Sequence, residues 1–147
     1  MSKGILLVNL GSPDSTKVED VRTYLREFLM DKKVLDSPWI IRKTVVELFI
    51  LPKRPEKSAE AYRKIWTKEG SPLIVYSKIL RDMVQKQMDV PVVLAMRYKN
   101  PSIEAGLEEL YNKGVRDILI VPLYPQYTMS STETVADKVL EIQKKKY

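Results

Sequence analysis

Side chains that could bind a polar ligand gather in three short stretches, at residues 11–15, 97–100 and 124–132. The first is a turn with one glycine, Gly11, so it is neither a dinucleotide fingerprint nor a phosphate-binding P-loop. The second places a cation and a phenol, Arg97 and Tyr98, where they could contact a ligand or pair with a carboxylate of the protein. The third combines Tyr124 and Tyr127 with Ser and Thr hydroxyls ahead of a helix, a position that suits a bound anion as well as ordinary helix capping.

The amino-acid composition narrows the chemistry that these stretches can perform. The sequence of 147 residues contains no His and no Cys. These absences exclude Ser–His triads, His- or Cys-based zinc sites, iron–sulfur ligation and disulfides within the chain. Any catalysis by this chain alone would fall to carboxylates, Lys, Tyr or Ser. The net charge of +6 comes from scattered Lys and Arg, so binding to nucleic acid is not expected.

Three apolar runs precede the polar stretches, and they predict the elements that position them. Residues 5–10, 91–96 and 117–121 are continuous apolar runs of the kind found in buried parallel strands. Helical patterns follow each run, which predicts an α/β fold with a parallel sheet covered on both faces. Because ligands bind at the carboxyl ends of such strands, the three polar stretches are expected to meet at one edge of the sheet.

Two helices carry specific expectations. Asn100-Pro101 is expected to open one helix as its N-cap and first residue. Ser71-Pro72 is expected to open another, whose apolar inner face would consist of Leu73, Tyr76, Leu80, Met83 and Val84.

Residues 31–70 interrupt the alternation of strands and helices and are interpreted as an insertion. Its stretch from Trp39 to Leu51 is apolar around most of its circumference. As a helix it would reach about 20 Å, too short for a hydrocarbon core of about 30 Å. Such a helix either packs within the protein, covers a large apolar ligand, or rests on a membrane with Arg42, Lys43, Lys53 and Arg54 near the headgroups.

Five motifs, in this order and spacing, resemble the ferrochelatase family across essentially the whole chain. They are Leu7-Val8-Asn9-Leu10-Gly11-Ser12-Pro13, then Phe28-Leu29-Met30-Asp31, then Pro52-Lys53-Arg54-Pro55 with the following Tyr62 and Ser71, then Met96-Arg97-Tyr98, and last Tyr124-Pro125-Gln126-Tyr127.

The resemblance implies a three-layer α/β/α chelatase-like domain, similar to flavodoxin, over residues 1–147, with residues 31–70 as an apolar helical lip. It implies the N-terminal half of an enzyme of haem biosynthesis that inserts ferrous iron into protoporphyrin IX or a related porphyrin. The family's catalytic His and metal-binding Glu lie in a C-terminal half that this chain does not contain. We therefore expect no catalytic or metal-binding residue here, and we expect the chain alone to be inactive.

The resemblance also assigns roles to seven residues. Arg54, Tyr62 and Ser71 are expected to contact the porphyrin, with Arg54 paired to a propionate. The wall of the cleft that faces the metal would be formed by Leu10, Arg97, Tyr98 and Tyr124.

Further expectations concern cofactors and partners. Met129 stands where some members of the family have a Cys iron–sulfur ligand, so no cluster is expected, and ferrous iron is a substrate. The expected partners are the porphyrin, the C-terminal half of the enzyme, and a membrane surface contacted by Trp39 to Leu51. The sequence shows no signal peptide, so the expected location is the cytoplasm, peripherally at the inner membrane. Two alternatives stay open: a non-catalytic porphyrin- or haem-binding module, and a flavodoxin-like phosphate- or nucleotide-binding domain.

Overall fold

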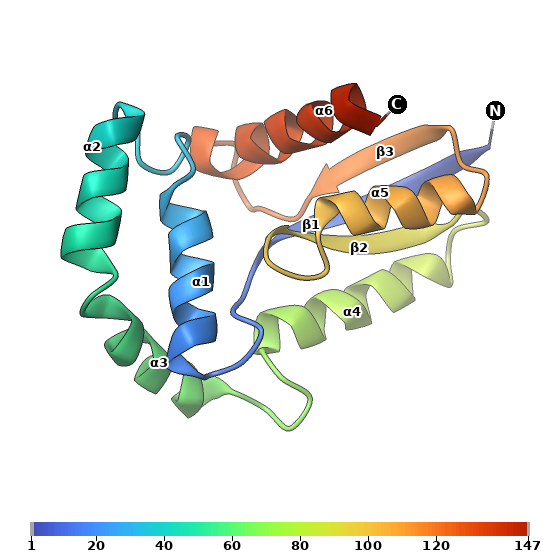
Figure 1. The fold of residues 1–147 in the computed structure, drawn as a ribbon. Helices are drawn as coiled ribbons and strands as arrows, with labels where there is room; N and C mark the ends of the chain where they lie inside the picture. Colours follow the sequence, from blue (N-terminus) through green and yellow to red (C-terminus); the bar gives the residue numbers. More distant parts are fainter. Residues whose placement is uncertain (1, 147) are drawn as a thin grey trace. The chain divides into compact units, whose positions relative to one another are not determined.

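A parallel three-stranded sheet forms the centre of the computed structural model, which describes residues 2–146 (Figure 1). The strands are β1 (Lys3–Gly11), β2 (Val92–Tyr98) and β3 (Asp117–Pro122), in the order β2-β1-β3. Both pairings with β1 are parallel. The expected α/β fold with a parallel sheet is confirmed.

The chain divides into two compact units. One unit comprises Met1–Gly11 and Tyr76–Tyr147 and contains the sheet. The other comprises Ser12–Val75 and is helical. The residues expected to form the insertion lie within this helical unit.

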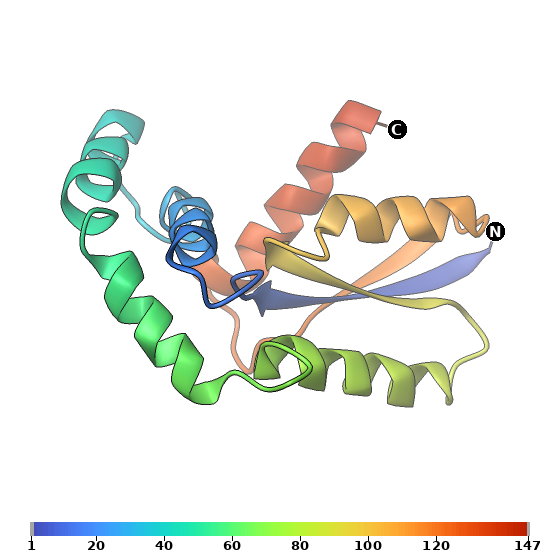
Figure 2. The same ribbon diagram turned by 60° about the horizontal axis from the view of Figure 1, so that its bottom comes forward.

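Helices lie on both faces of the sheet within the first unit (Figure 2). One face packs against α5 (Ile103–Asn112) and α6 (Thr134–Lys146), and the other carries the part of α4 (Pro72–Gln85) that belongs to this unit. Because side chains alternate along a strand, Leu6 and Val8 both point to the α5 and α6 face. They form the core there with the buried faces of the two helices.

The rotation of α4 differs from the sequence prediction. Tyr76 is 70% exposed and Met83 57% exposed, and Leu80 is exposed too, so these three residues do not form an inner face. The buried position is Ser77, whose hydroxyl accepts a hydrogen bond of 2.9 Å from the Asn9 side-chain amide. The prediction was wrong because a polar pair between the sheet and the helix, which periodicity does not reveal, sets the side of α4 that faces inward.

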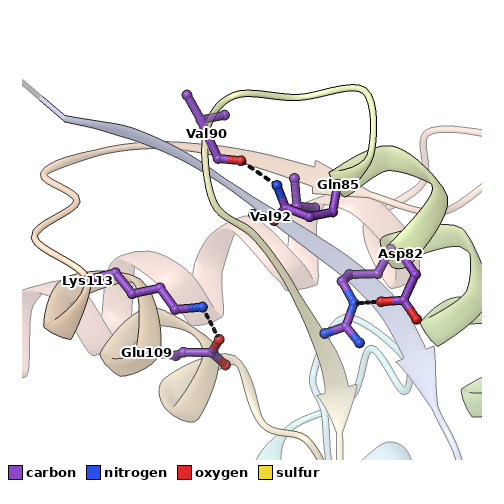
Figure 3. Close-up of polar contacts among 7 residues, drawn as sticks. Asp82, Gln85, Val90, Val92, Glu109 and Lys113 are labelled. Atoms are coloured by element: carbon purple, nitrogen blue, oxygen red, sulfur yellow. Dashed lines mark hydrogen bonds and ion pairs between the residues drawn. The ribbon is translucent and has the colours of Figure 1, made fainter.

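The end of α4 is tied to the start of β2 by one side chain (Figure 3). The Gln85 amide donates to the Val90 carbonyl at 3.0 Å, and its oxygen accepts from the Val92 N–H at 2.7 Å. The Gln85 side chain therefore links the last residue of α4 to the first residue of β2 and to the loop between them. Figure 3 also shows Lys113 paired with Glu109 at 2.6 Å, one turn apart at the end of α5.

The N-cap of α5 also differs from the expectation. Ser102, and not Asn100, caps the helix, because its hydroxyl accepts from the Ala105 N–H at 3.1 Å. The carbonyl of Pro101 instead accepts from the Met96 N–H at 2.6 Å. The loop before α5 therefore continues along the outer edge of β2, and the helix begins only after that pairing ends.

The second unit consists of α1 (Val18–Leu29), α2 (Trp39–Thr44), a π-helix η1 (Val45–Ile50) and α3 (Arg54–Ile65). The expected helix from Trp39 to Leu51 thus changes from α to π winding at Val45. An ion pair joins η1 to α1, with Arg26 Nε 2.7 Å and Nη2 3.3 Å from the two Glu47 carboxylate oxygens. No helix among the described residues is both long enough and apolar enough to cross a membrane.

Candidate functional site

The stretch from Trp39 to Leu51, called the lip below, presents large apolar side chains to solvent. Its exposed members are Trp39, Ile40, Ile41, Val45, Leu48 and Phe49. Trp39 is 57% exposed and Phe49 is 72% exposed, so a helix fully packed within its unit is excluded. Val46, by contrast, is completely buried on a segment that contacts α1. Arg42 is buried as well, and its guanidinium donates to the Ser37 carbonyl at 2.6 Å and to the Leu35 carbonyl at 3.3 Å, so it does not reach the headgroups as expected from the sequence.

A basic groove opens where the lip meets α3. It has a volume of about 580 Å³ and is lined by Phe49, Ile50, Lys53, Arg54, Lys57, Ser58 and Ala61. The lining therefore combines three cations with the apolar side chains of Phe49, Ile50 and Ala61.

Helix geometry explains how α3 builds this groove. Arg54, Lys57, Ser58 and Ala61 lie at spacings of three, four and seven residues, which places them on one face of the helix. Pro55, in the first turn, suits the start of a helix because its missing N–H is not needed there. Arg54 is exposed and makes no ion pair within residues 2–146, so Glu56 and Glu60 do not neutralise it. The groove is suited to a ligand that carries carboxylates on an apolar body.

Tyr62 belongs to a row of aromatic side chains on α1 and α3. Its ring meets Tyr24 edge-on at 6.5 Å and Trp66 edge-on at 6.2 Å between centroids. Burial raises the pKa of the Tyr62 phenol, and a hydrogen bond with Tyr24 opposes part of that rise. The phenol is therefore neutral at physiological pH and available as a hydrogen-bond donor.

Ser71 is buried and directly precedes α4. Its carbonyl accepts the Val75 N–H at 3.0 Å, which makes it part of the first turn of that helix. Arg54, Tyr62 and Ser71 thus all lie in the second unit, the first two on α3 and the third at the start of α4.

The other four predicted site residues lie in the first unit, at or just beyond the carboxyl ends of the strands. Leu10 is on β1, Arg97 and Tyr98 are on β2, and Tyr124 follows β3. Gly11 allows the ends of β1 and β2 to meet closely, because a Cβ there would lie 2.1 Å from the Tyr98 carbonyl oxygen. Its φ of 117° also belongs to the region that favours glycine.

Arg97 is held in place from two sides. Its guanidinium lies 4.5 Å from the centroid of the Tyr98 ring. Its Nε donates to the Thr134 carbonyl at 3.1 Å and to the Thr134 hydroxyl at 2.8 Å. Tyr98 is fully buried, and Tyr124 is half-buried against the core of this unit. Arg97 is therefore the more accessible residue of the two, and its guanidinium packs on the ring of the buried Tyr98.

The hydroxyls after β3 mostly bond to one another. The Ser131 hydroxyl accepts from the Thr128 N–H at 2.9 Å and lies 2.7 Å from the Thr128 hydroxyl. Tyr127 donates to Glu133 at 2.8 Å. These contacts favour helix capping over an anion site at residues 124–132.

Three residues of the candidate site were not identified from the sequence. Lys57 and Ser58 share the groove with Arg54, and their spacing from Arg54 on a helix with Pro55 in its first turn is a signal that could have found them. Thr134 holds Arg97, but nothing in the sequence links positions that far apart.

Comparison with known proteins identifies the family. A protein called ferrochelatase from Azotobacter vinelandii (strain DJ / ATCC BAA-1303) is 53% identical over 139 residues, which cover 94% of this chain and 41% of that protein. Ferrochelatase from Pseudomonas fluorescens (strain SBW25) is 50% identical over 143 residues, 97% of this chain and 42% of that protein. Ferrochelatase from Coxiella burnetii (strain CbuK_Q154) is 49% identical over 138 residues, 92% of this chain and 39% of that protein.

The chain thus spans about two fifths of the length of these relatives, and it matches their N-terminal part. The model of the family described as ferrochelatase matches residues 2–147. Because that match covers nearly every residue, the chain belongs to the ferrochelatase family.

Proposed function

We propose that this chain is the porphyrin-binding half of an enzyme of haem biosynthesis that inserts ferrous iron into protoporphyrin IX or a related porphyrin. The observation that carries the proposal is the basic groove, which Arg54 and two lysines line together with apolar side chains of the lip. A porphyrin has the matching chemistry, because it is a large apolar macrocycle with carboxylates at one side.

Arg54 is the residue proposed to bind a propionate. It is charged at every physiological pH, its guanidinium can hold a carboxylate through two parallel hydrogen bonds, and it makes no ion pair within the described chain that would compete. Lys57 and Ser58 supply further donors on the same helix face. Tyr62 and Ser71 are proposed as further porphyrin contacts in the same unit.

The strand ends of the first unit are proposed to form the wall that faces the metal. Leu10 would supply apolar contact, and Tyr124 would flank it from the loop after β3. Arg97, fixed by Thr134 and supported by Tyr98, would present a permanent charge in a set position. Preorganised groups of this kind bind a bent macrocycle without having to reorganise.

The chemistry of metal insertion requires that two pyrrole protons leave as one ferrous ion enters. The chain has no His to accept them. We propose that the proton acceptor and the metal-binding carboxylate belong to the C-terminal part of the enzyme, and that this chain alone does not catalyse insertion. Ferrous iron is the substrate, and no iron–sulfur cluster is proposed because Met129 stands at the position of the ligand.

The lip is proposed to contact a membrane surface from the cytoplasmic side, where apolar porphyrins partition. Its exposed Trp39, Leu48 and Phe49 would enter the interface, and Lys43 and Lys53 would lie at the headgroups. We further propose that the sheet and its helices are a three-layer, flavodoxin-like chelatase domain with residues 31–70 as the lip.

The test of this proposal is porphyrin binding by the 147-residue chain, followed by quenching of porphyrin fluorescence. Because the groove is open and Arg54 is exposed, a charge-assisted bond there should contribute near the lower end of its usual range, or about tenfold in affinity. Arg54→Ala should therefore weaken binding of the free-acid porphyrin about tenfold. Binding of a porphyrin with esterified propionates should be the same for both proteins, because the pairing is already absent.

Lys64→Ala is the matched control, since it removes an exposed cation from the same helix outside the groove. Equal affinity of the original chain and Arg54→Ala for the free acid would remove Arg54 from the site. Metalloporphyrin formation by the chain alone, above the uncatalysed rate, would overturn the proposal that insertion requires groups of the C-terminal part.

The single-glycine turn at Gly11 gives no support to the nucleotide-binding alternative. A non-catalytic porphyrin carrier would use the same groove, and it would differ from the enzyme in showing no metal insertion when the chain is joined to its C-terminal part.

A further inference from the structure

The lip and the start of α3 carry unbalanced positive charge. Glu47 is the only carboxylate among residues 39–54, and it is already paired with Arg26 of α1, whose Nε lies 2.7 Å from a carboxylate oxygen. Arg42 is buried and donates to two backbone carbonyls, so its charge is not presented at the surface. The charge that this segment leaves uncompensated is therefore positive.

Four exposed cations accompany the apolar surface of the lip: Lys43, Lys53, Arg54 and Lys57. None of the four makes an ion pair within residues 2–146. Lys43 Nζ lies 4.7 Å from the centroid of the Trp39 ring, so one of these cations stands directly beside an exposed aromatic side chain. An apolar surface with unpaired cations beside it is complementary to a surface that is apolar below and negative above.

Phe49 joins the apolar surface of the lip to the basic groove. It is 72% exposed, and it also lines the groove together with the last three of those cations. Glu56 and Glu60 do not line the groove, because their positions two and six residues after Arg54 place them on the other side of α3. If Phe49 enters a membrane interface, the groove therefore opens close to the headgroups.

We propose that the basic groove binds the phosphate headgroups of anionic phospholipids when the lip rests on a membrane. Arg54 can hold two phosphate oxygens through parallel hydrogen bonds, and the two lysines add compact positive charges. A zwitterionic headgroup brings a cation of its own, which the groove cations repel, so lipids with a net negative charge are favoured.

The inference rests on the membrane contact of the proposed function, and it adds the class of lipid and the cations that select it. The same cations cannot pair with a headgroup and with a porphyrin propionate at once. The two ligands would therefore exclude each other from the groove, and each would weaken the binding of the other by the same factor.

The size of the expected lipid preference follows from the number of cations. Each Lys or Arg close to an anionic bilayer strengthens binding by about fivefold. Two engaged cations would give about 25-fold, and we expect binding to anionic vesicles to be at least about twentyfold tighter than to neutral ones at low ionic strength. The preference should largely disappear at about 1 M salt, where the Debye length is only about 3 Å.

Co-sedimentation with lipid vesicles tests the inference without porphyrin. The 147-residue chain is titrated with vesicles of phosphatidylcholine alone and with vesicles of phosphatidylcholine mixed with phosphatidylglycerol. The first kind measures the apolar contact of the lip, and the difference between the two kinds measures the contribution of the cations.

Two double variants locate that contribution. Lys53→Gln combined with Lys57→Gln should weaken binding to the anionic vesicles by about 25-fold and leave binding to the neutral vesicles unchanged. The matched control combines Lys64→Gln with Lys68→Gln, which removes the same charge from exposed positions of the same unit outside the groove. The control should lose about threefold at most, and unchanged circular dichroism would show that both variants keep the fold.

Several results would overturn the inference. Equal binding to the two kinds of vesicle would do so while leaving the proposed membrane contact in place, and absence of binding to either kind would overturn both. Equal losses in the two double variants would assign the preference to the basic surface as a whole and not to the groove. Displacement from the vesicles by inorganic phosphate, where chloride of the same ionic strength has no effect, would make the groove a site for free anions. Because porphyrin is absent throughout, none of these outcomes bears on the proposed binding of porphyrin.

Discussion

Gly11 is the residue where a single added methyl group should disturb the strand ends most. Its φ of 117° is strained for any other residue, and a Cβ would stand 2.1 Å from the Tyr98 carbonyl oxygen. The neighbouring atom belongs to the backbone of β2, at the last pair of a parallel pairing, where Gly11 is in register with Tyr98. Neither a side-chain rotation nor a small local shift can therefore relieve the contact.

The magnitude of the effect follows from two contributions. The unfavourable φ contributes about 1–3 kcal/mol. Forcing the two strands apart contributes about 1–3 kcal/mol more, as for other overpacked sites. We expect Gly11→Ala to lower the free energy of unfolding by roughly 2–6 kcal/mol, a large part of the 5–15 kcal/mol of an ordinary domain.

Gly114→Ala separates these two contributions. Gly114 also has a positive φ, 80°, and lies in the same unit, but a Cβ there would meet nothing within 4 Å. It should lose only about 1 kcal/mol, from the backbone alone. Urea unfolding followed by circular dichroism measures both variants against the original chain. Equal losses at the two glycines would refute the argument from close approach.

Two further predictions concern polar contacts within single units. The Arg26 guanidinium lowers the pKa of Glu47, chiefly through their hydrogen bond. The pair therefore stabilises the folded chain fully above the unfolded pKa of about 4.3. This stabilisation is lost as pH falls through the lower pKa of the folded state. Both side chains are partly exposed, so Glu47→Gln should lower the free energy of unfolding by only about 0.5 kcal/mol at pH 7 and by less at pH 3. If urea unfolding gives the same difference between the original chain and Glu47→Gln at both pH values, the prediction is wrong. Ser77→Ala should lower stability by about 1–2 kcal/mol, because it deprives the Asn9 amide of its acceptor. Asn9 also accepts the Leu10 N–H, so Asn9→Ala should still lower stability in the Ser77→Ala background, but by less than it does in the original chain. Fully additive losses in this double-mutant cycle would show that the bond contributes nothing.

Much of the fold could be predicted because it depends on local patterns. The predicted runs 5–10, 91–96 and 117–121 became β1, β2 and β3, which end one or two residues later than predicted. Continuous apolar runs mark strands of a parallel sheet, although β3 has no fully buried residue. The apolar side of α5 was also predictable, because Ile103, Leu107 and Leu110 repeat at helical spacing and are all buried. The placing of Arg97 and Tyr98 at a strand end followed from the same pattern.

Predictions failed where two distant segments decide the outcome together. The outward rotation of α4 depends on the bond between Asn9 and Ser77, which lie far apart in sequence. The burial of Val46 and the π winding of η1 accompany the ion pair from Glu47 to Arg26 on another helix. The groove residues Lys57 and Ser58 required knowledge of where α3 begins.

The sequence by itself determined the class of fold, the family and the absence of histidine chemistry, because these depend on composition and on the order of motifs along the chain. Only the tertiary structure decided that α4 turns Ser77 and not its predicted apolar residues toward the sheet, and how Arg97 is held. These features are contacts between segments that are remote in sequence. Their energies depend on geometry that hydrophobic periodicity does not contain, since periodicity reports one segment at a time.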